Sequence, residues 1–271
     1  NDDGELIIDL SDGCFDDHVD VINMSLGGGG DPESSGYREI IEAATELGIV
    51  VVISAGNSGP SSTTIGCPGC IEQSVAVAAS FKEYLSGYDS YGNFVEYFTD
   101  DIAPFSSRGP TRPTICDEEN EEDCIYPPGT QLDKPDITGP GVYICAARAG
   151  FGPYSGSQCE DGNHASISGT SMSSPHVAGA VALLRQIHPE LNSHEIKELL
   201  LSQYVMDLGI DKWDQGFGRI NMCLTGLCDD CEDNLVEIGN QCVPIDIEVL
   251  DLSNQNMSTY LPSTIGQLSN L

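Results

Sequence analysis

The chain has 271 residues, of which 39% are hydrophobic, so it can form a large globular domain with a substantial core. Its 43 acidic and 10 basic residues give a formal net charge of −33, which excludes nucleic acid and anionic membrane surfaces as expected partners because like charges repel. Eleven cysteines, several in close pairs, are typical of an exported, disulfide-bonded protein, so we expect a secreted or extracellular location.

The N-terminal end suggests a longer parent protein. Asn1 stands where a complete chain would begin with Met, and no signal-peptide pattern follows it. An odd number of cysteines leaves one without a partner, and Cys14 is expected to pair with sequence upstream. The longest apolar run, 49–53, is too short to span a bilayer, so we expect no membrane anchor.

A strand, a helix and a second strand are predicted first. Residues 19–26 form an apolar strand that runs into glycines, and the β-branched run 49–53 forms another. The helix between them is predicted over 37–47, with Ser34 or Ser35 as its cap and Gly48 ending it. Such units build parallel sheets covered by helices, with sites beyond the carboxyl ends of the strands. The expected buried side of the helix consists of Ile40, Ile41, Ala44 and Leu47.

The middle of the chain is predicted to be mainly polar surface. A third apolar strand covers 74–79, and a polar stretch follows over 81–130. Within this stretch lies an acidic loop, 116–124, which begins and ends with cysteine. We interpret it as a disulfide-closed surface insertion, because nothing in its spacing fixes a metal ion.

Two amphipathic helices follow. Over 171–188 the apolar positions repeat at helical spacing, and Pro189 ends the pattern. The next helix begins at Asn192, which forms a capping box with Glu195. The expected buried residues are Val177, Ala180, Val181 and Leu184 in the first helix, and Ile196, Leu199 and Leu200 in the second.

The composition changes near residue 222, which suggests three parts. We expect a main domain over 1–222, a cysteine-rich linker or cap over 223–246, and the start of leucine-rich repeats of the plant-like kind over 247–271. One repeat cannot bury its own apolar face, so further repeats and a protein ligand for them are expected in the parent protein. The Cys67/Cys70 and Cys228/Cys231 pairs lie in separate parts of the chain, which favours disulfides over a zinc site.

Ser171 and Asn57 carry the chemistry that the pattern suggests. Ser171 stands at the start of a long helix, where backbone N–H groups and the positive end of the helix dipole are available. Asn57 ends a buried strand, from which its amide could meet a developing negative charge. The two residues are therefore candidates for a nucleophile and an oxyanion hole.

Six ordered segments carry a family resemblance. Gly-Thr-Ser-Met-Ser-Ser-Pro-His-Val-Ala-Gly at 169–179 resembles the serine signature of the subtilisin-like serine peptidases, or subtilases. Five further segments resemble segments of that family in the same order, and they are 23–28, 54–59, 105–110, 134–141 and 216–221. The resemblance covers about residues 1–222, and it implies an α/β three-layer sandwich with a mostly parallel sheet whose N-terminal part is missing.

The resemblance also implies roles for individual residues. Ser171 would be the nucleophile that forms an acyl-enzyme with polypeptide substrates, and Asn57 would supply the oxyanion side chain. No cofactor is required and no metal ligand is assigned. Structural calcium is left open, although no motif supports it. The residues implied in substrate binding are Ser25, Leu26, Gly27, Ser54, Ala55, Gly56, Gly169 and Thr170.

The base for Ser171 is not found in this sequence. In the family both the triad Asp and the triad His precede the segment that 23–28 resembles, so Asp9, Asp12 and His18 stand in the wrong context. His176 lies five residues beyond Ser171 on the same helix and points away from it by roughly 140°, so we interpret it as a packed helix residue. We therefore expect the chain alone to be inert.

The sequence argues against two other enzyme classes, the α/β-hydrolases and the zinc peptidases, and leaves one non-enzymatic alternative open. The chain has no Gly-x-Ser-x-Gly elbow, and His194-Glu195 is not followed by the second histidine of a zinc peptidase, because residue 198 is Glu. The alternative is a non-catalytic adhesion or recognition protein, in which a degenerate peptidase domain carries the repeats. Intact Asp and His motifs upstream would favour the enzyme, and their replacement would favour the scaffold.

Overall fold

The structure is a computed structural model that describes residues 19–29, 36–88, 92–111, 131–148, 157–159 and 164–222, and the backbone of strands at 235–238 and 241–244. Its centre is a six-stranded sheet with the order β1-β2-β3-β6-β11-β10. Neighbouring strands are parallel except for the antiparallel pair β10 and β11. The prediction of a mostly parallel sheet is therefore confirmed. The strands are β1 (Val21–Met24), β2 (Val50–Ser54), β3 (Val75–Ser80), β6 (Ile137–Pro140), β10 (Val205–Met206) and β11 (Arg219–Ile220).

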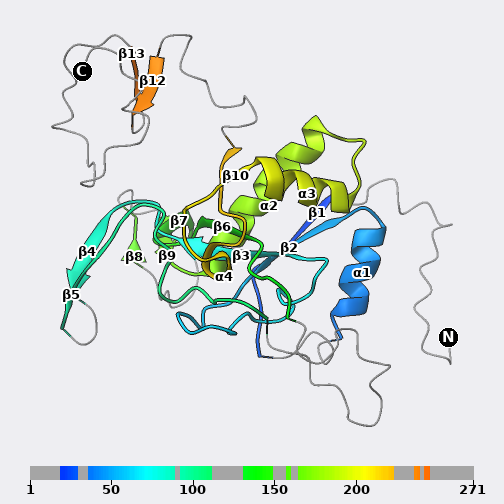
Figure 1. Cartoon of the computed structure of the whole chain (residues 1–271), viewed down its shortest axis with the longest axis horizontal. Coiled ribbons are helices and arrows are strands. Elements are labelled where there is room, and N and C mark those ends of the chain that lie inside the picture. The colour runs from blue at the N-terminus through cyan, green and yellow to red at the C-terminus, as the bar shows by residue number, and fades with distance from the viewer. Residues whose placement is uncertain are drawn as a thin grey trace.

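Helices cover both faces of this sheet, as Figure 1 shows. Helix α1 (Arg38–Glu46) packs on one face, while α2 (Thr170–Ile187) and α3 (Ser193–Gln203) pack on the other. Strand β2 connects the two cores because successive side chains of a strand point to opposite faces. Val50 and Val52 join the core under α2 and α3, whereas Val51 and Ile53 join the core under α1. The expected α/β three-layer arrangement is confirmed.

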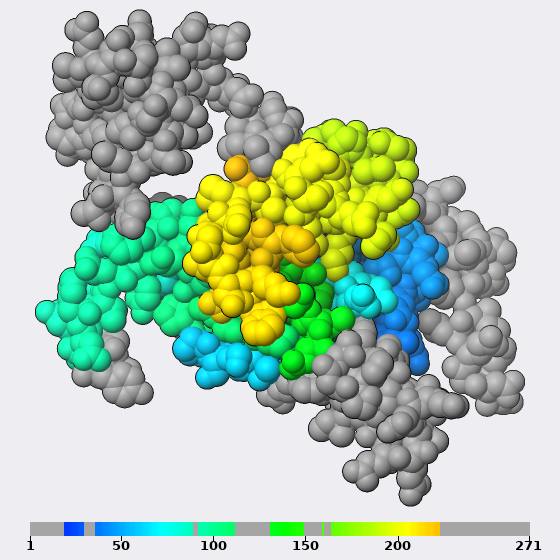
Figure 2. Space-filling model, viewed as in Figure 1, coloured from blue at the N-terminus to red at the C-terminus, as the bar shows by residue number. Residues whose placement is uncertain are grey.

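Smaller sheets surround the central one. The hairpin of β4 (Leu85–Tyr88) and β5 (Phe94–Tyr97) extends from the body at the left of Figure 2. Strands β7 (Ile144–Ala147), β8 (Ser157–Gln158) and β9 (His164–Ile167) form a three-stranded antiparallel sheet. A short helix, α4 (Lys212–Gln215), precedes β11, and β12 (Leu235–Ile238) pairs with β13 (Gln241–Pro244). The sequence interpretation of 81–130 as a plain polar stretch therefore missed the β4–β5 hairpin.

The buried side of α1 is narrower than predicted. Ile41 is buried at 2% exposure and Ala44 is half-buried, but Ile40 is 60% exposed and Leu47 is 41% exposed. Consecutive helix residues point about 100° apart, and a helix that packs on one sheet buries only the stripe that faces it. Placing Ile40 and Leu47 in the core was therefore wrong. The helix is preceded by Tyr37 as N-cap, with no side-chain cap, and Ser34 and Ser35 lie outside the described residues.

The predictions for α2 and α3 are confirmed. The four-residue stripe of α2 is buried, as are Ile196 and Leu200 of α3, with Leu199 packed against them. The capping box is present, because the Glu195 N–H donates to Asn192 Oδ1 at 3.0 Å and the Asn192 N–H donates to Glu195 Oε2 at 2.8 Å. The Arg185 guanidinium donates to the carbonyls of Gly48 and Leu191, which connects α2 to the ends of two loops.

A buried ionic cluster connects the start of β6 to α3 and to the turn before β3. Lys134 Nζ lies 2.6 Å from Asp136 Oδ2, and Lys197 Nζ lies 3.3 Å from Asp136 Oδ1. Both ammonium groups also donate to the Ser74 carbonyl. Burial lowers the pKa of Lys134 to about 8, against the opposing attraction of Asp136. Burial acts to raise the pKa of Asp136, but Lys134 and Lys197 together hold it below its ordinary value.

Two disulfides are present within the described residues, Cys67–Cys70 and Cys145–Cys159. The first confirms the disulfide interpretation of the Cys67/Cys70 pair. The part of the chain that the structure describes contains no group of three or more His, Cys, Asp or Glu side chains that could hold a metal ion. In the same part, no helix is both long and apolar enough to cross a bilayer.

Several predictions concern parts of the chain outside the described residues. They are Asp9, Asp12, Cys14, His18, the acidic loop 116–124, Cys223, Cys228, Cys231 and the repeat at 247–271. Of the cysteine-rich segment 223–246, only the backbone of β12 and β13 is described.

Candidate active site

Ser171 lies in the first turn of α2, beside the loop that follows β1. Helix α2 begins at Thr170, so the Ser171 N–H is one of the four backbone donors that a helix leaves without an internal partner. The Ser171 hydroxyl donates to the Ser25 carbonyl at 3.4 Å, and the Ser25 hydroxyl donates to the Ser171 carbonyl at 2.8 Å. These two bonds bring together residues that are 146 positions apart in the sequence.

The Asn57 side chain is oriented by Thr170. Asn57 Oδ1 accepts hydrogen bonds from the Thr170 N–H at 2.9 Å and from the Thr170 hydroxyl at 3.0 Å. The Thr170 hydroxyl in turn accepts from the Gly56 N–H at 3.2 Å. Because the Thr170 N–H can only donate, the carbonyl end of the Asn57 amide must face it, and the Nδ2 end remains to donate elsewhere. A Cβ on Gly169 would stand 3.5 Å from Nδ2, so Gly169 lies against this amide.

Asn57 follows a glycine that no other residue replaces easily. Gly56 has a φ of +108°, and a Cβ there would stand 2.8 Å from the Ser107 hydroxyl. That hydroxyl accepts from the Ser58 N–H at 3.1 Å, and the Ser107 N–H donates to the Gly56 carbonyl at 2.9 Å. The motif at 105–110 thus supports the loop that carries Asn57.

The predicted substrate-binding segment is exposed at the carboxyl end of β1. Ser25, Leu26 and Gly27 are exposed, whereas Ser54 and Ala55 are buried behind them. The Ser54 hydroxyl donates to the Leu26 carbonyl at 3.1 Å, which ties the two segments together. The structure therefore brings all ten predicted site residues to one edge of the sheet.

Two polar residues of this edge were missed by sequence reasoning. The buried Ser174 hydroxyl donates to Asn23 Oδ1 at 2.5 Å, and Asn23 Nδ2 donates to the Ser25 hydroxyl at 3.1 Å. A chain of hydrogen bonds therefore runs from Ser174 through Asn23 and Ser25 to Ser171. The available signal was the spacing of Ser174, which lies three residues after Ser171 and so one turn further along the same side of α2.

No hydrogen bond within the described residues joins a histidine to Ser171. His176 is exposed, and its Nδ1 lies 2.8 Å from the Met172 carbonyl. His188 and His194 lie near Glu190 and Glu198. The interpretation of His176 as a packed residue was wrong, because its side chain is exposed beside the buried stripe of α2 and not within it.

Ser173 sits beneath the site without a hydrogen-bond partner. It is fully buried, and its hydroxyl bonds to no group within the described residues. A Cβ on Gly141 would stand 2.2 Å from the Ser173 hydroxyl, and one on Gly139 would stand 3.2 Å from the Ser173 carbonyl. The two glycines of the 134–141 motif therefore make room for the start of α2.

Comparisons with known proteins agree on one family. The model of the Subtilase family matches residues 2–219. The chain is 34% identical over 219 residues to the serine protease AprX of Bacillus subtilis, an alignment that covers 76% of this chain and 42% of that protein. It is 36% identical over 186 residues to pyrolysin of Pyrococcus furiosus, which covers 61% of this chain and 11% of that protein.

Solved structures show the same likeness. The S41 psychrophilic protease is 30% identical, with a TM-score of 0.52 over 74% of this chain and 57% of that chain. Sphericase is 26% identical, with a TM-score of 0.50 over 74% of this chain and 56% of that chain. The chain thus spans about half the length, or less, of these relatives.

Proposed function

Because the chain belongs to the subtilase family of serine peptidases, we propose that it carries the nucleophile of a secreted serine endopeptidase, and that this nucleophile is Ser171. The single observation that carries the proposal is that Ser171 lies beside the Asn57 side-chain amide, whose Oδ1 already accepts hydrogen bonds from Thr170. Thr170 engages Asn57 Oδ1 through two hydrogen bonds, which leaves Asn57 Nδ2 and the Ser171 N–H as donors at the start of α2.

The proposed reaction follows from these donors. The Ser171 hydroxyl attacks the carbonyl carbon of a peptide bond while its proton passes to a general base. The negative charge that develops on the carbonyl oxygen is stabilised by the Ser171 N–H and by Asn57 Nδ2. The tetrahedral intermediate then expels the amine, which takes up the proton, and water hydrolyses the remaining ester to release the acid and restore Ser171.

We place the general base and its aspartate in sequence outside this chain. His176, His188 and His194 contact groups other than Ser171, and the chain spans 42% of the AprX protein. The 271-residue chain alone is therefore expected to be inert, while the full-length protein is expected to be active.

Polypeptide substrates fit the exposed backbone beside Ser171. We assign Ser25, Leu26 and Gly27 to pairing with substrate backbone, since they are exposed and adjacent to Ser171. Ser54, Ala55 and Gly56 would form the wall behind the substrate, with Gly169 and Thr170 next to the nucleophile. The two disulfides support export to an oxidising compartment. We also propose recognition through leucine-rich repeats, which start over 247–271 and follow a cysteine-rich linker or repeat cap over 223–246.

The test is labelling with a fluorophosphonate, which reacts with activated serines. Three samples are compared: the full-length protein, its Ser171→Ala variant, and the 271-residue chain. Labelling of the full-length protein alone, lost in Ser171→Ala, is the expected result. If the correctly folded full-length protein takes up no label, the peptidase proposal is wrong and the non-catalytic scaffold is favoured.

A further inference from the structure

The segment that would pair with substrate continues into a run of glycines. Residues 27–30 are four consecutive glycines, which follow directly after Ser25 and Leu26. Glycine has the greatest backbone freedom of any residue, so such a run loses the most entropy when it is held in one conformation. At Gly28 and Gly29 an added Cβ would meet nothing within 4 Å, so open space surrounds these positions. Packing therefore does little to hold this segment in place.

Backbone pairing with Cys67 holds it instead. The Gly28 N–H donates to the Cys67 carbonyl at 3.0 Å, and the Cys67 N–H donates to the Gly28 carbonyl at 3.1 Å. The pair forms an isolated antiparallel bridge. The bridge lies beside the Ser54–Leu26 hydrogen bond, so these two contacts hold Leu26 and Gly28, while the hydrogen bonds with Ser171 hold Ser25.

The loop that carries Cys67 is itself fixed in place. Cys67 and Cys70 are joined by a disulfide across only three positions, and their exposures are 6% and 2%. Both pack in the core cluster between α1 and β2, with Ile41 and Ile53 among its members. The Gly66 N–H donates to the Ala55 carbonyl at 2.9 Å. The disulfide loop is thus anchored to the strand that leads to Asn57.

We propose that the Cys67–Cys70 disulfide is a positioning element for substrate binding, which holds Ser25, Leu26 and Gly27 in register with the Asn57 strand. The inference rests on the proposed function, because it concerns binding of the same polypeptide substrates. Neither cysteine touches the reacting atoms in this role. The disulfide makes no printed bond to Ser171 or Asn57 and reaches Ser171 only through the Ser25 hydrogen bonds, so its loss should raise KM more than it lowers kcat.

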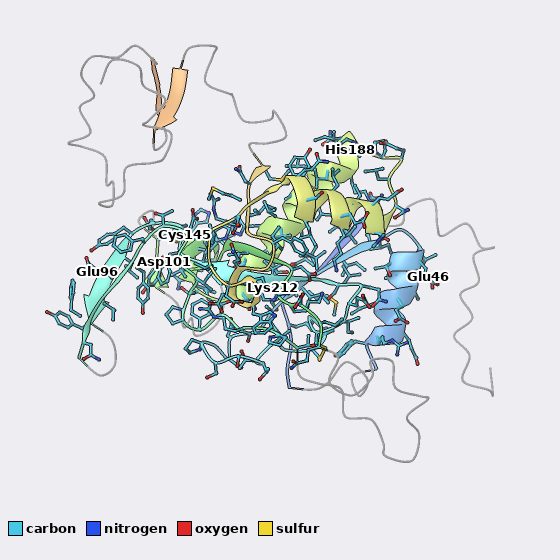
Figure 3. The ribbon with its side chains drawn as sticks, in the orientation of Figure 1. Glu46, Glu96, Asp101, Cys145, His188 and Lys212 are labelled. Carbon is cyan, nitrogen blue, oxygen red and sulfur yellow. A yellow bond between two sulfur atoms is a disulfide. The ribbon has the colours of Figure 1, made fainter. Side chains whose placement is uncertain are left out.

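The experiment uses the full-length protein and a matched pair of double variants. Cys67→Ser/Cys70→Ser removes the positioning disulfide. Cys145→Ser/Cys159→Ser removes the other described disulfide, whose Cys145 lies on β7 at the opposite side of the body from Glu46 of α1 in Figure 3. A third variant adds Gly29→Ala to the first pair, because alanine stiffens the backbone at a position where its Cβ meets no neighbour.

Each variant is measured in three ways, so that a failure of the positioning role can be distinguished from a failure of the proposed peptidase function. Fluorophosphonate labelling reports whether Ser171 is activated. Hydrogen exchange of a peptide that covers residues 25–29 reports whether the segment is held, independently of activity. Values of kcat and KM on peptide substrates report the consequence for binding. We expect faster exchange and a KM raised about tenfold in Cys67→Ser/Cys70→Ser, which corresponds to about 1.4 kcal/mol, with KM partly restored by Gly29→Ala and unchanged in the control pair.

Two results would overturn the inference. One is exchange over 25–29 that matches the wild type, and the other is a normal KM in a variant that still takes up label. Absence of label in the wild type would instead refute the proposed function, and the exchange data would still decide whether the disulfide holds the segment. If Cys67→Ser/Cys70→Ser does not fold, Gly28→Pro removes the donor to Cys67 with the disulfide intact. It must then produce the same faster exchange, or the inference fails.

Discussion

At the scale of single residues, the Thr170 hydroxyl helps to orient Asn57. It supplies one of the two donors to Asn57 Oδ1 and accepts from the Gly56 N–H. Thr170→Val keeps the shape of the side chain and removes these two hydrogen bonds, while the backbone N–H still donates to Oδ1. We expect kcat of the full-length enzyme to fall about tenfold with KM little changed, because a loosely held oxyanion donor matters most in the transition state.

Thr170→Ser is the matched control, since it restores the hydroxyl, and its kcat should return to within a few-fold of the wild type. Equal losses of kcat in Thr170→Val and Thr170→Ser would show that the methyl group matters and the hydrogen bonds do not.

Replacing Ser173 is expected to stabilise the protein. Its hydroxyl is buried and has no partner among the described residues, and an unsatisfied buried polar group costs roughly 1–3 kcal/mol. Ser173→Ala should raise the free energy of unfolding by about 1 kcal/mol, after allowance for the contacts that the hydroxyl loses. Urea denaturation measures this directly. A lower stability would mean that the hydroxyl has a partner in solution, such as an ordered water.

The residues of the site differ in how well the sequence predicts them. Ser171 and Asn57 belong to long local motifs, so the amino-acid sequence is enough to identify both as candidates. Asn23 and Ser174 were missed, because their hydrogen bond joins positions 151 apart and no local pattern encodes that contact. The burial of His176 was predicted wrongly for a related reason. Helical spacing gives the direction of its side chain relative to Ser171, but it does not show whether another element packs against that side chain.

At the scale of secondary structure elements, Asp136 holds the start of β6 to α3. Two ammonium groups converge on this buried carboxylate, so Asp136→Asn would leave Lys134 and Lys197 facing each other without a counter-charge. We expect a loss of about 3–5 kcal/mol in the free energy of unfolding, as for other buried pairs broken at one side. Asp133→Asn is the control, because the exposed pair of Asp133 and Lys212 should contribute less than about 1 kcal/mol.

The same cluster gives a pH dependence. The pKa of Lys134 is lowered from 10.5 to about 8 in the folded protein. Between these pH values the folded state has released a proton that the unfolded state still binds, so the contribution of Lys134 to stability rises with pH. The slope cannot exceed about 1.4 kcal/mol per pH unit.

Urea denaturation of the wild type and of Lys134→Met between pH 8 and pH 10 isolates this contribution from that of other titrating groups. The difference in stability between wild type and variant should shift in favour of the wild type as the pH rises. A constant difference would show that Lys134 stays protonated over this range.

Long elements were predicted better than short or exposed ones. Strands β2 and β3 and helices α2 and α3 are buried and strongly periodic, and their positions agree with the sequence patterns within a few residues. The β4–β5 hairpin was missed because its strands have only four residues each and their exposed face carries Tyr88 and Phe94, so the sequence shows no alternation of polar and apolar residues although the burial alternates. The predicted buried side of α1 included too many residues, because a sequence shows which residues are apolar but not which of them a neighbouring element covers.

At the scale of the whole molecule, charge repulsion should be measurable. A net charge of −33 favours expanded states over the compact fold, and salt screens this repulsion. We expect the Tm at pH 7 to rise when NaCl is increased from about 10 mM to about 150 mM. The matched control is the same titration near pH 4, close to the sequence pI of about 4.1, where the rise should vanish. A Tm at pH 7 that does not respond to NaCl would contradict this prediction.

Helix α2 contributes both to the candidate active site and to the hydrophobic core. Its first turn carries Ser171, and the next turns bury Val177, Val181 and Leu184 in the largest core of the sheet. A change in that core would therefore shift Ser171, the proposed nucleophile, so the stability of the fold and the proposed chemistry depend on the same helix. We therefore expect substitutions in the buried stripe of α2 to be tolerated less well than substitutions in the projecting β4–β5 hairpin (Figure 1), because the hairpin lies away from that core.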